Sequence, residues 1–396
     1  MAARVMSKAN PAMLRWARET RGYSLEVAAG SLDVEKDLLE KAERGEDRLS
    51  FAQLRKAADK YKRPLAVFFL PEPPRSRPRV TDFRRLPESM GHELSPALLL
   101  QVRRLSYKRS IAIRLSEFAG AVNWNFVGSR QVSEDPENVG TEVRRLLDLP
   151  LEITSRWREP YARMNGWRSA IERTGTLVFI VQRMPIIEMR GMSIAEAPFP
   201  LLAVNRADAP GPRLFSLLHE FTHILIGRSS LCDDFVEDEY RNDDEARRIE
   251  VFCNAVAAAS LMPQNAFRSA AAQERMRSQT SGRWEEGSIR MIADKFGVSA
   301  ESALRRLLDL GLAHQDEYDS FRREWQSRPI PVITDEEERS FGEYGHDVVL
   351  RTQGKNYVRM VLDAMHQEAI GITDAADYLD MKLKHLAALE DGVVTG

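Results

Sequence analysis

The segment LFSLLHEFTHILIG, at residues 214–227, constrains the fold of this chain more than any other stretch. It places His219, Glu220 and His223 in the pattern H-E-x-x-H. Four residues of α-helix turn the chain by about 400°, so the two histidines project from nearly the same side, about 6 Å apart. A separate, apolar arc of the same helix carries Leu217, Leu218, Phe221, Ile224 and Leu225. The pattern therefore predicts a helix that buries one face against a sheet and carries chemistry on the other.

Two imidazoles at this spacing suit a single Zn²⁺ ion. Glu220 lies about 60° beyond the arc of the two histidines, close enough to take a proton from a water at the metal. A structural zinc site is one alternative, but it needs four protein ligands and no free glutamate beside them. A chance coincidence among the seven histidines is another, and the apolar flanks of the motif argue against it. The motif therefore predicts a hydrolytic zinc site with Glu220 as its base.

A hydrolytic site with two histidines needs a third protein ligand and an open position for water. The candidate carboxylates downstream are Glu237, Glu239, Asp243, Asp244, Glu245 and Glu250. Most of them lie in an acidic stretch that is typical of a solvated surface loop. Glu250 instead lies in the apolar segment ARRIEVFCNAVAAASLMP, where a buried carboxylate is costly without a partner such as a metal. A salt bridge to Arg247, or exposure to solvent, explains its position equally well.

The composition is that of a soluble globular protein, with 43% hydrophobic residues, 29% charged residues and a net charge of -2. No apolar run approaches the ~18 residues that cross a bilayer, and the start MAARVMSKAN lacks the apolar core of an export signal. The only cysteines, Cys232 and Cys253, exclude a disulfide framework and fit a reducing compartment. We therefore expect a cytoplasmic protein without membrane contact, in which Cys253 is a buried thiol.

Hydrophobic periodicity predicts an α+β, predominantly helical chain. Residues 11–71 form a helical unit, with Ser24 and Ser50 as predicted N-caps, and the proline-rich PEPPRSRPRV after it predicts a boundary. Apolar, β-branched runs predict strands at 176–182 and 201–205.

At 396 residues the chain is too long for one typical core. The alanines of a predicted helix at about 244–260 favour close packing on another element. The domains that we expect are a helical N-terminal domain at 1–74, a helical linker region at 75–170, a domain with a small sheet at 171–315 and a small helical domain at 316–396.

Residues 171–312 resemble the ImmA/IrrE family of metallopeptidases. The segments that carry the resemblance are IERTGTLVFI, RGMSI, PLLAVN, PRLFSLLHEFTHILIG, IEVFCNAVAAASLMP and FGVSAESALRRLLDLGL. The family holds zinc with the two histidines of H-E-x-x-H and with a glutamate four residues before an Asn. The resemblance therefore implies a zincin-like domain in which Zn²⁺ binds His219, His223 and Glu250, since Glu250 stands four residues before Asn254. Departures from the family pattern at Thr222, Phe252 and Cys253 touch none of these ligands.

The N-terminal domain resembles an Xre/Cro-type helix-turn-helix, on the segment LRWARETRGYSLEVAAGSLDVEKDLLEKAERG. Its expected recognition helix, about 34–42, carries Glu35, Asp37 and Glu40 against Lys36 and Lys41. Because phosphate contacts need Lys or Arg, we expect DNA binding to be weak and the domain to dock protein or a second copy of itself as a homodimer. The basic strip Lys60, Lys62, Arg63, Arg75, Arg77 and Arg79 either touches phosphates or is solvated linker charge.

The family resemblance implies a regulatory zinc endopeptidase that cleaves a repressor or antitoxin-like protein, itself with a helix-turn-helix, in the control of genes, of phage and mobile elements or of stress responses. Arg213 and Tyr240 are the candidates for stabilising the oxyanion. The alternative is a DNA-binding regulator or antitoxin-like protein whose zinc domain binds or senses a partner without turnover. Glu220 favours the enzyme, because a binding domain needs no base beside its metal.

Overall fold

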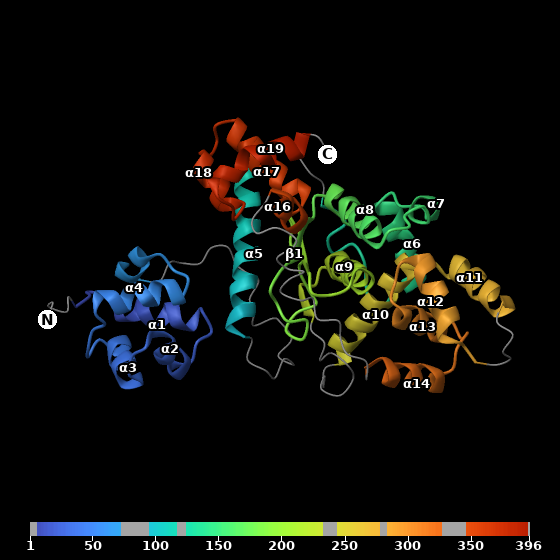
Figure 1. The fold of residues 1–396 in the computed structure, drawn as a ribbon, viewed down its shortest axis with the longest axis horizontal. Helices are drawn as coiled ribbons and strands as arrows, with labels where there is room; N and C mark the ends of the chain where they lie inside the picture. Colours follow the sequence, from blue (N-terminus) through green and yellow to red (C-terminus); the bar gives the residue numbers. More distant parts are fainter. Residues whose placement is uncertain are drawn as a thin grey trace. The chain divides into compact units, whose positions relative to one another are not determined.

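The structure, a computed structural model, describes residues 6–72, 95–116, 124–232, 244–277, 283–326 and 346–394 (Figure 1). The chain divides into two compact units, and the division falls between residues 106 and 107, within helix α5 (Pro96–Leu115). The proline-rich segment predicted as a domain boundary, with Arg75, Arg77 and Arg79, lies outside the described residues from residue 73 onward.

The first unit is helical. Its elements are α1 (Pro11–Glu19), α2 (Leu25–Leu32), α3 (Lys36–Arg44), α4 (Phe51–Lys60), the 3-10 helix η1 (Leu65–Phe69) and the first half of α5. Both predicted N-caps are confirmed. The side chain of Ser24 accepts a hydrogen bond from the backbone N–H of Val27, and Ser50 forms a capping box with Gln53. Gly45, with φ 82°, ends α3.

A buried ion pair crosses the core of this unit. Arg18 on α1 donates from Nε and Nη2 to the carboxylate of Glu43 on α3, at 2.7 and 2.9 Å. Around it pack fully buried apolar side chains, among them Leu39, Leu54 and Tyr61. The two parallel hydrogen bonds of this charge pair tie α1 to α3 in one orientation. Removing either partner would leave the other charge buried without compensation.

The second unit is built on a four-stranded mixed sheet with the order β1 (Leu177–Val181), β3 (Leu201–Asn205), β2 (Gly191–Ile194) and β4 (Ser230–Cys232). β1 and β3 are parallel, whereas β2 runs antiparallel to both β3 and β4. Both predicted strands are confirmed, as β1 and β3. Strands β2 and β4 were not predicted, because four and three residues are too short to show an alternating pattern.

Helices surround the sheet, and the fold class predicted from the sequence is confirmed as α+β and mainly helical. Helix α9 (Pro210–Leu225) packs on β2 and β3, α10 (Asp244–Leu261) packs on α9, and Figure 1 shows the last helices, in red, near β1. The helices are α6 (Pro136–Leu146), α7 (Leu151–Thr154), α8 (Pro160–Arg173), α9 (Pro210–Leu225), α10 (Asp244–Leu261), α11 (Gln264–Arg277), α12 (Glu286–Phe296), α13 (Ala300–Asp309), α14 (Gln315–Gln326), α16 (His346–Gln353), α17 (Lys355–His366), α18 (Ile372–Tyr378), η4 (Leu383–His385) and α19 (Leu386–Val394).

Small residues let α10 pack closely, as its alanines predict. A Cβ added to Gly140 of α6 would lie 2.6 Å from Cβ of Ala259 and 2.9 Å from the backbone nitrogen of Ser260. The same helix packs on α9. This packing brings α10 alongside the helix that carries the H-E-x-x-H motif.

The C-terminal helices pack, through α16, against the edge of the sheet formed by β1, which is opposite the edge formed by β4. Tyr357 of α17 meets Phe179 of β1 edge to face, with ring centroids 5.5 Å apart. On α8, Arg168 pairs with Glu172 at 2.9 Å and also donates to the carbonyl of Arg351. In the described part of the chain, no helix is both long enough and apolar enough to cross a membrane.

Candidate metal centre

Helix α9 holds the H-E-x-x-H motif in place through its apolar arc. Pro210 opens the helix, where a missing N–H costs nothing, and Gly227, with φ 70°, follows its end. The side chains of the arc are at most 2% exposed: Leu217, Leu218, Phe221, Ile224 and Leu225. Thr222 donates its hydroxyl to the carbonyl of Leu218 at 2.8 Å and so fits within the helix.

Helix α10 brings Glu250 to the two histidines. Oε2 of Glu250 lies 3.2 Å from Nε2 of His219, and its Oε1 lies 3.5 Å from Nε2 of His223. The two Nε2 atoms are 3.1 Å apart. One turn further along α10, Oδ1 of Asn254 lies 2.9 Å from Nδ1 of His219. It accepts a hydrogen bond in the tautomer that has the proton on Nδ1, and this tautomer leaves Nε2 free to bind a metal.

These distances suit a zinc ion. Ligand atoms at ~2.0–2.1 Å from a tetrahedral Zn²⁺ are about 3.3 Å from one another. The three separations of 3.1, 3.2 and 3.5 Å lie around that value. Among the described residues, this is the one group of histidine, cysteine and carboxylate side chains that is placed to hold a metal ion. Two imidazoles and one carboxylate are the donor set of a hydrolytic zinc site with an open fourth position.

The charges of the site are strongly coupled. Burial raises the pKa of Glu250, but hydrogen bonds and charges from His219 and His223 outweigh burial and lower it far below its usual 4.5. Burial lowers the pKa of His219, while Glu250 and then Glu220 raise it by more, so the net shift is upward. A buried carboxylate kept ionised beside two imidazoles is prepared to bind a cation.

Of the other candidate carboxylates, Glu245 is described and is not brought to this centre. Glu245 is exposed and pairs with Arg228 at 3.0 Å. Glu237, Glu239 and Asp243 lie outside the described residues, and so does the side chain of Asp244. Of the two positions considered for Glu250, exposure to solvent is excluded, because its side chain is 14% exposed.

Glu220 is fully buried next to the histidines, against β2 and β4. Its Oε2 accepts from the hydroxyl of Ser230, which is also hydrogen-bonded to the hydroxyl of Ser193 at 2.8 Å. Its Oε1 has no hydrogen-bond partner within the described chain. A Cβ on Gly191 would lie 2.6 Å from this Oε1 atom, so only glycine leaves room for the carboxylate. One oxygen is therefore fixed and the other is free to accept a proton.

Sequence reasoning missed Ser193, Ser230 and Gly191 as parts of the site. The glycine in RGMSI was a usable signal, because a glycine inside a strand often marks a close approach. The serines gave none, since their pairing depends on β2 lying beside β4.

The remaining predictions for this region have different outcomes. The guanidinium of Arg213 donates to the carbonyls of Arg206 and Asp208, so it holds the loop before α9. Tyr240 lies outside the described residues. Cys253 is a free, fully buried thiol, as expected, and burial raises its pKa far above the usual value.

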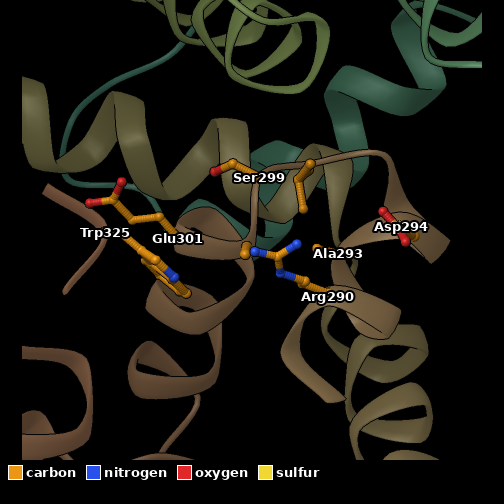
Figure 2. A pocket seen from close by; sticks show the side chains of 8 residues that line it. Arg290, Ala293, Asp294, Ser299, Glu301 and Trp325 are labelled. Atoms are coloured by element: carbon orange, nitrogen blue, oxygen red, sulfur yellow. The ribbon is translucent and has the colours of Figure 1, made fainter. Parts of the chain in front are cut away.

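A cavity of about 420 Å³ lies between α12, α13 and α14, away from the metal-centre residues (Figure 2). Trp325, Glu301 and Asp294 line it around the guanidinium of Arg290. That guanidinium is already held by Glu286, at 2.6 Å. Among the described residues, its lining includes no group of side chains placed to hold a metal ion.

Comparison with known proteins supports a metallopeptidase over this part of the chain. Residues 178–308 match the model of the IrrE N-terminal-like domain, and the match includes both α9 and Glu250. The chain is also similar to the radiation response metalloprotease IrrE of Deinococcus radiodurans, with 34% identity over 110 residues. The matched region is 28% of this chain, and it spans about a third (31%) of the relative's length.

Proposed function

We propose that this protein is a zinc-dependent endopeptidase in which His219, His223 and Glu250 hold the metal and Glu220 is the catalytic base. The observation that carries the proposal is the convergence of the three ligand atoms, within 4.8 Å of one another, beside a buried glutamate with one free oxygen. The similarity of residues 178–308 to a metallopeptidase family supports it independently.

The residues present fit Zn²⁺ by donor type and by separation. Zn²⁺ at such a site acts as a Lewis acid toward a peptide carbonyl and lowers the pKa of water toward ~7. Asn254 orients His219 so that Nε2 faces Glu250. Nδ1 of His223 is buried without a hydrogen-bond partner in the described chain, and the polar contacts of this ring are made by Nε2, with His219 and Glu250.

Glu220 does the proton chemistry in this proposal. Its free Oε1 accepts the proton of the attacking water and passes it to the amine that leaves. Ser230 holds the other oxygen, so the carboxylate cannot swing away between the two transfers. Burial in a site from which water is largely excluded strengthens each of these interactions.

The substrate that we propose is a repressor or antitoxin-like protein, and the proposed role is regulatory and cytoplasmic. The similarity to a metalloprotease named for a radiation response supports the regulatory role, and the ion pairs of α3 favour protein over DNA as the partner of the N-terminal helices. Lys36 pairs with Glu26, and Lys41 with Asp37, so carboxylates offset the positive charge that this helix would present to DNA phosphates. We propose that the N-terminal helices act as a helix-turn-helix domain that docks the substrate or a second copy of the chain.

The proposed activity can be tested before any substrate is identified. Zinc-loaded protein is mixed with an extract of the cells that encode it, and newly formed protein N-termini are labelled and identified. The control is Glu220→Gln, which keeps the metal ligands but cannot accept the proton. We expect one zinc per chain in both proteins and new N-termini with the wild type alone. Equal sets of N-termini from both proteins would show that Glu220 is not the base.

A further inference from the structure

Arginines of the first unit differ in their partners. On α3, Arg44 lies 3.4 Å from Glu46 and 3.8 Å from Glu40. A second group, Arg21, Arg63, Arg103 and Arg104, makes no ion pair with any carboxylate in the described part of the chain. These four side chains come from the end of α1, the end of α4 and the first half of α5.

Hydrogen bonds bring Arg21 and Arg63 together at the start of α5. Arg63 donates from Nη2 to the hydroxyl of Thr20 at 3.1 Å, directly beside Arg21 in the chain. Arg21 in turn donates to the carbonyl of Pro96, at the start of α5. Arg103 lies two turns further along α5, close enough to Arg63 and Arg21 for their charges to act on it. The ends of α1 and α4 and the start of α5 therefore meet at one point.

Close backbone packing and aromatic rings hold the group in position. Gly22 has φ 74°, and a Cβ there would lie 2.4 Å from Cδ1 of Leu99, so α5 approaches α1 at this glycine. The guanidinium of Arg63 lies 4.3 Å from the ring centre of Trp16. That of Arg21 lies 5.1 Å from the ring centre of Tyr23. Stacked guanidinium groups lose little freedom when a ligand binds.

The group carries positive charge that nothing in the described chain neutralises. Arg21 is only 9% exposed. Three guanidinium nitrogens are buried without a hydrogen-bond partner there: Nε of Arg21, Nε of Arg63 and Nη1 of Arg103. Burial, and then repulsion by Arg63, Arg21 and Arg104, lowers the pKa of Arg103 to about 10. Buried donors without partners and like charges side by side both cost free energy, which a bound anion offsets.

We propose that Arg21, Arg63 and Arg103 form a binding site for a phosphate group. Guanidinium forks pair with phosphate through two parallel hydrogen bonds, and three of them match a doubly charged oxyanion better than a single carboxylate. The phosphate belongs either to a small phosphorylated molecule or to the backbone of a nucleic acid. In both cases the anion binds where α1, α4 and α5 meet, and α3 takes no part.

The test measures binding of inorganic phosphate to the full-length protein by calorimetry, in a phosphate-free buffer at constant ionic strength. We expect saturable binding that Arg103→Gln weakens by about tenfold or more. Arg44→Gln, which removes a paired arginine from α3, is the matched control and keeps wild-type affinity. Without phosphate, Arg103→Gln should melt at a higher temperature than the wild type, because the substitution removes repulsion and a buried unpaired charge. That second measurement also shows that the variant is folded.

A labelled 24-base-pair duplex of random sequence identifies the source of the phosphate. Duplex binding that free phosphate displaces, and that Arg103→Gln weakens, assigns the site to a nucleic-acid backbone. Phosphate binding without duplex binding assigns it to a small phosphorylated ligand. The proposal is overturned if the wild type does not bind phosphate, or if Arg103→Gln and Arg44→Gln change its affinity equally. The latter result would place the anion elsewhere, for example at the metal centre.

Discussion

Replacing Gly191 with alanine tests whether the position of Glu220 matters. The added Cβ would lie 2.6 Å from Oε1, 2.8 Å from Cγ and 3.0 Å from Cδ of Glu220. Carbon atoms pack best at about 3.5–4.0 Å, so the carboxylate must move by about 1 Å. Helix α9 cannot supply this movement, because Leu217 and Phe221 are fully buried on its other side. The side chain of Glu220 therefore has to rotate and give up its hydrogen bond from Ser230.

The expected effects on activity and on stability are different in size. A displacement of about 1 Å at a reacting group lowers a rate by about 100-fold. Overpacking of a buried site costs about 1–3 kcal/mol in the free energy of unfolding, which leaves most molecules folded. The nearest atoms to the new Cβ all belong to Glu220, so zinc affinity should stay within about threefold of wild type, since each tenfold change needs about 1.4 kcal/mol at the ligands.

The assay compares zinc content, circular dichroism and the rate of cleavage of a substrate found by N-terminal labelling. Gly287→Ala is the matched control, because a Cβ at Gly287 meets nothing within 4 Å. We expect Gly287→Ala to cleave at the wild-type rate and Gly191→Ala to cleave about 100-fold more slowly with its zinc retained. A folded, zinc-loaded Gly191→Ala protein with the wild-type rate would refute the role assigned to Glu220.

Three further predictions concern the same site. Glu250→Ala should weaken zinc binding by at least about 100-fold, because it removes a ligand and not merely a group that orients one. Undiminished zinc content after dialysis would show that another carboxylate binds the metal. Ser230→Ala should keep zinc but cleave about tenfold more slowly, because Oε2 of Glu220 loses its donor; an unchanged rate would mean that packing alone fixes the carboxylate. In the presence of a chelator, the lowered pKa of Glu250 makes its ionised form a stabilising group above pH 4.5, and this stability is lost as the pH falls. Urea unfolding of the metal-free protein should therefore show a fall in stability toward acid that Glu250→Gln reduces, and identical pH profiles for the two proteins would contradict the coupling.

The sequence determined the parts of this protein that depend on neighbours along the chain. The spacing of His219 and His223 and the apolar arc beside them follow from the period of one helix, and the structure has both on α9. The caps at Ser24 and Ser50 are local for the same reason. The strands β1 and β3 were predictable because both are long enough to show buried, β-branched runs.

Only the tertiary structure shows which distant residues lie beside Glu220 and the two histidines. From spacing alone, Glu250 was as compatible with a surface salt bridge as with a metal, until the packing of α10 on α9 placed it 3.2 Å from His219. Ser230 and Gly191 belong to separate short strands, and they reach Glu220 only through the pairing of β2 with β4. The arginine group in the first unit likewise joins three helix ends. Contacts of this kind join residues far apart in the chain, and the periodicity of one element shows which face is buried but not which element covers it.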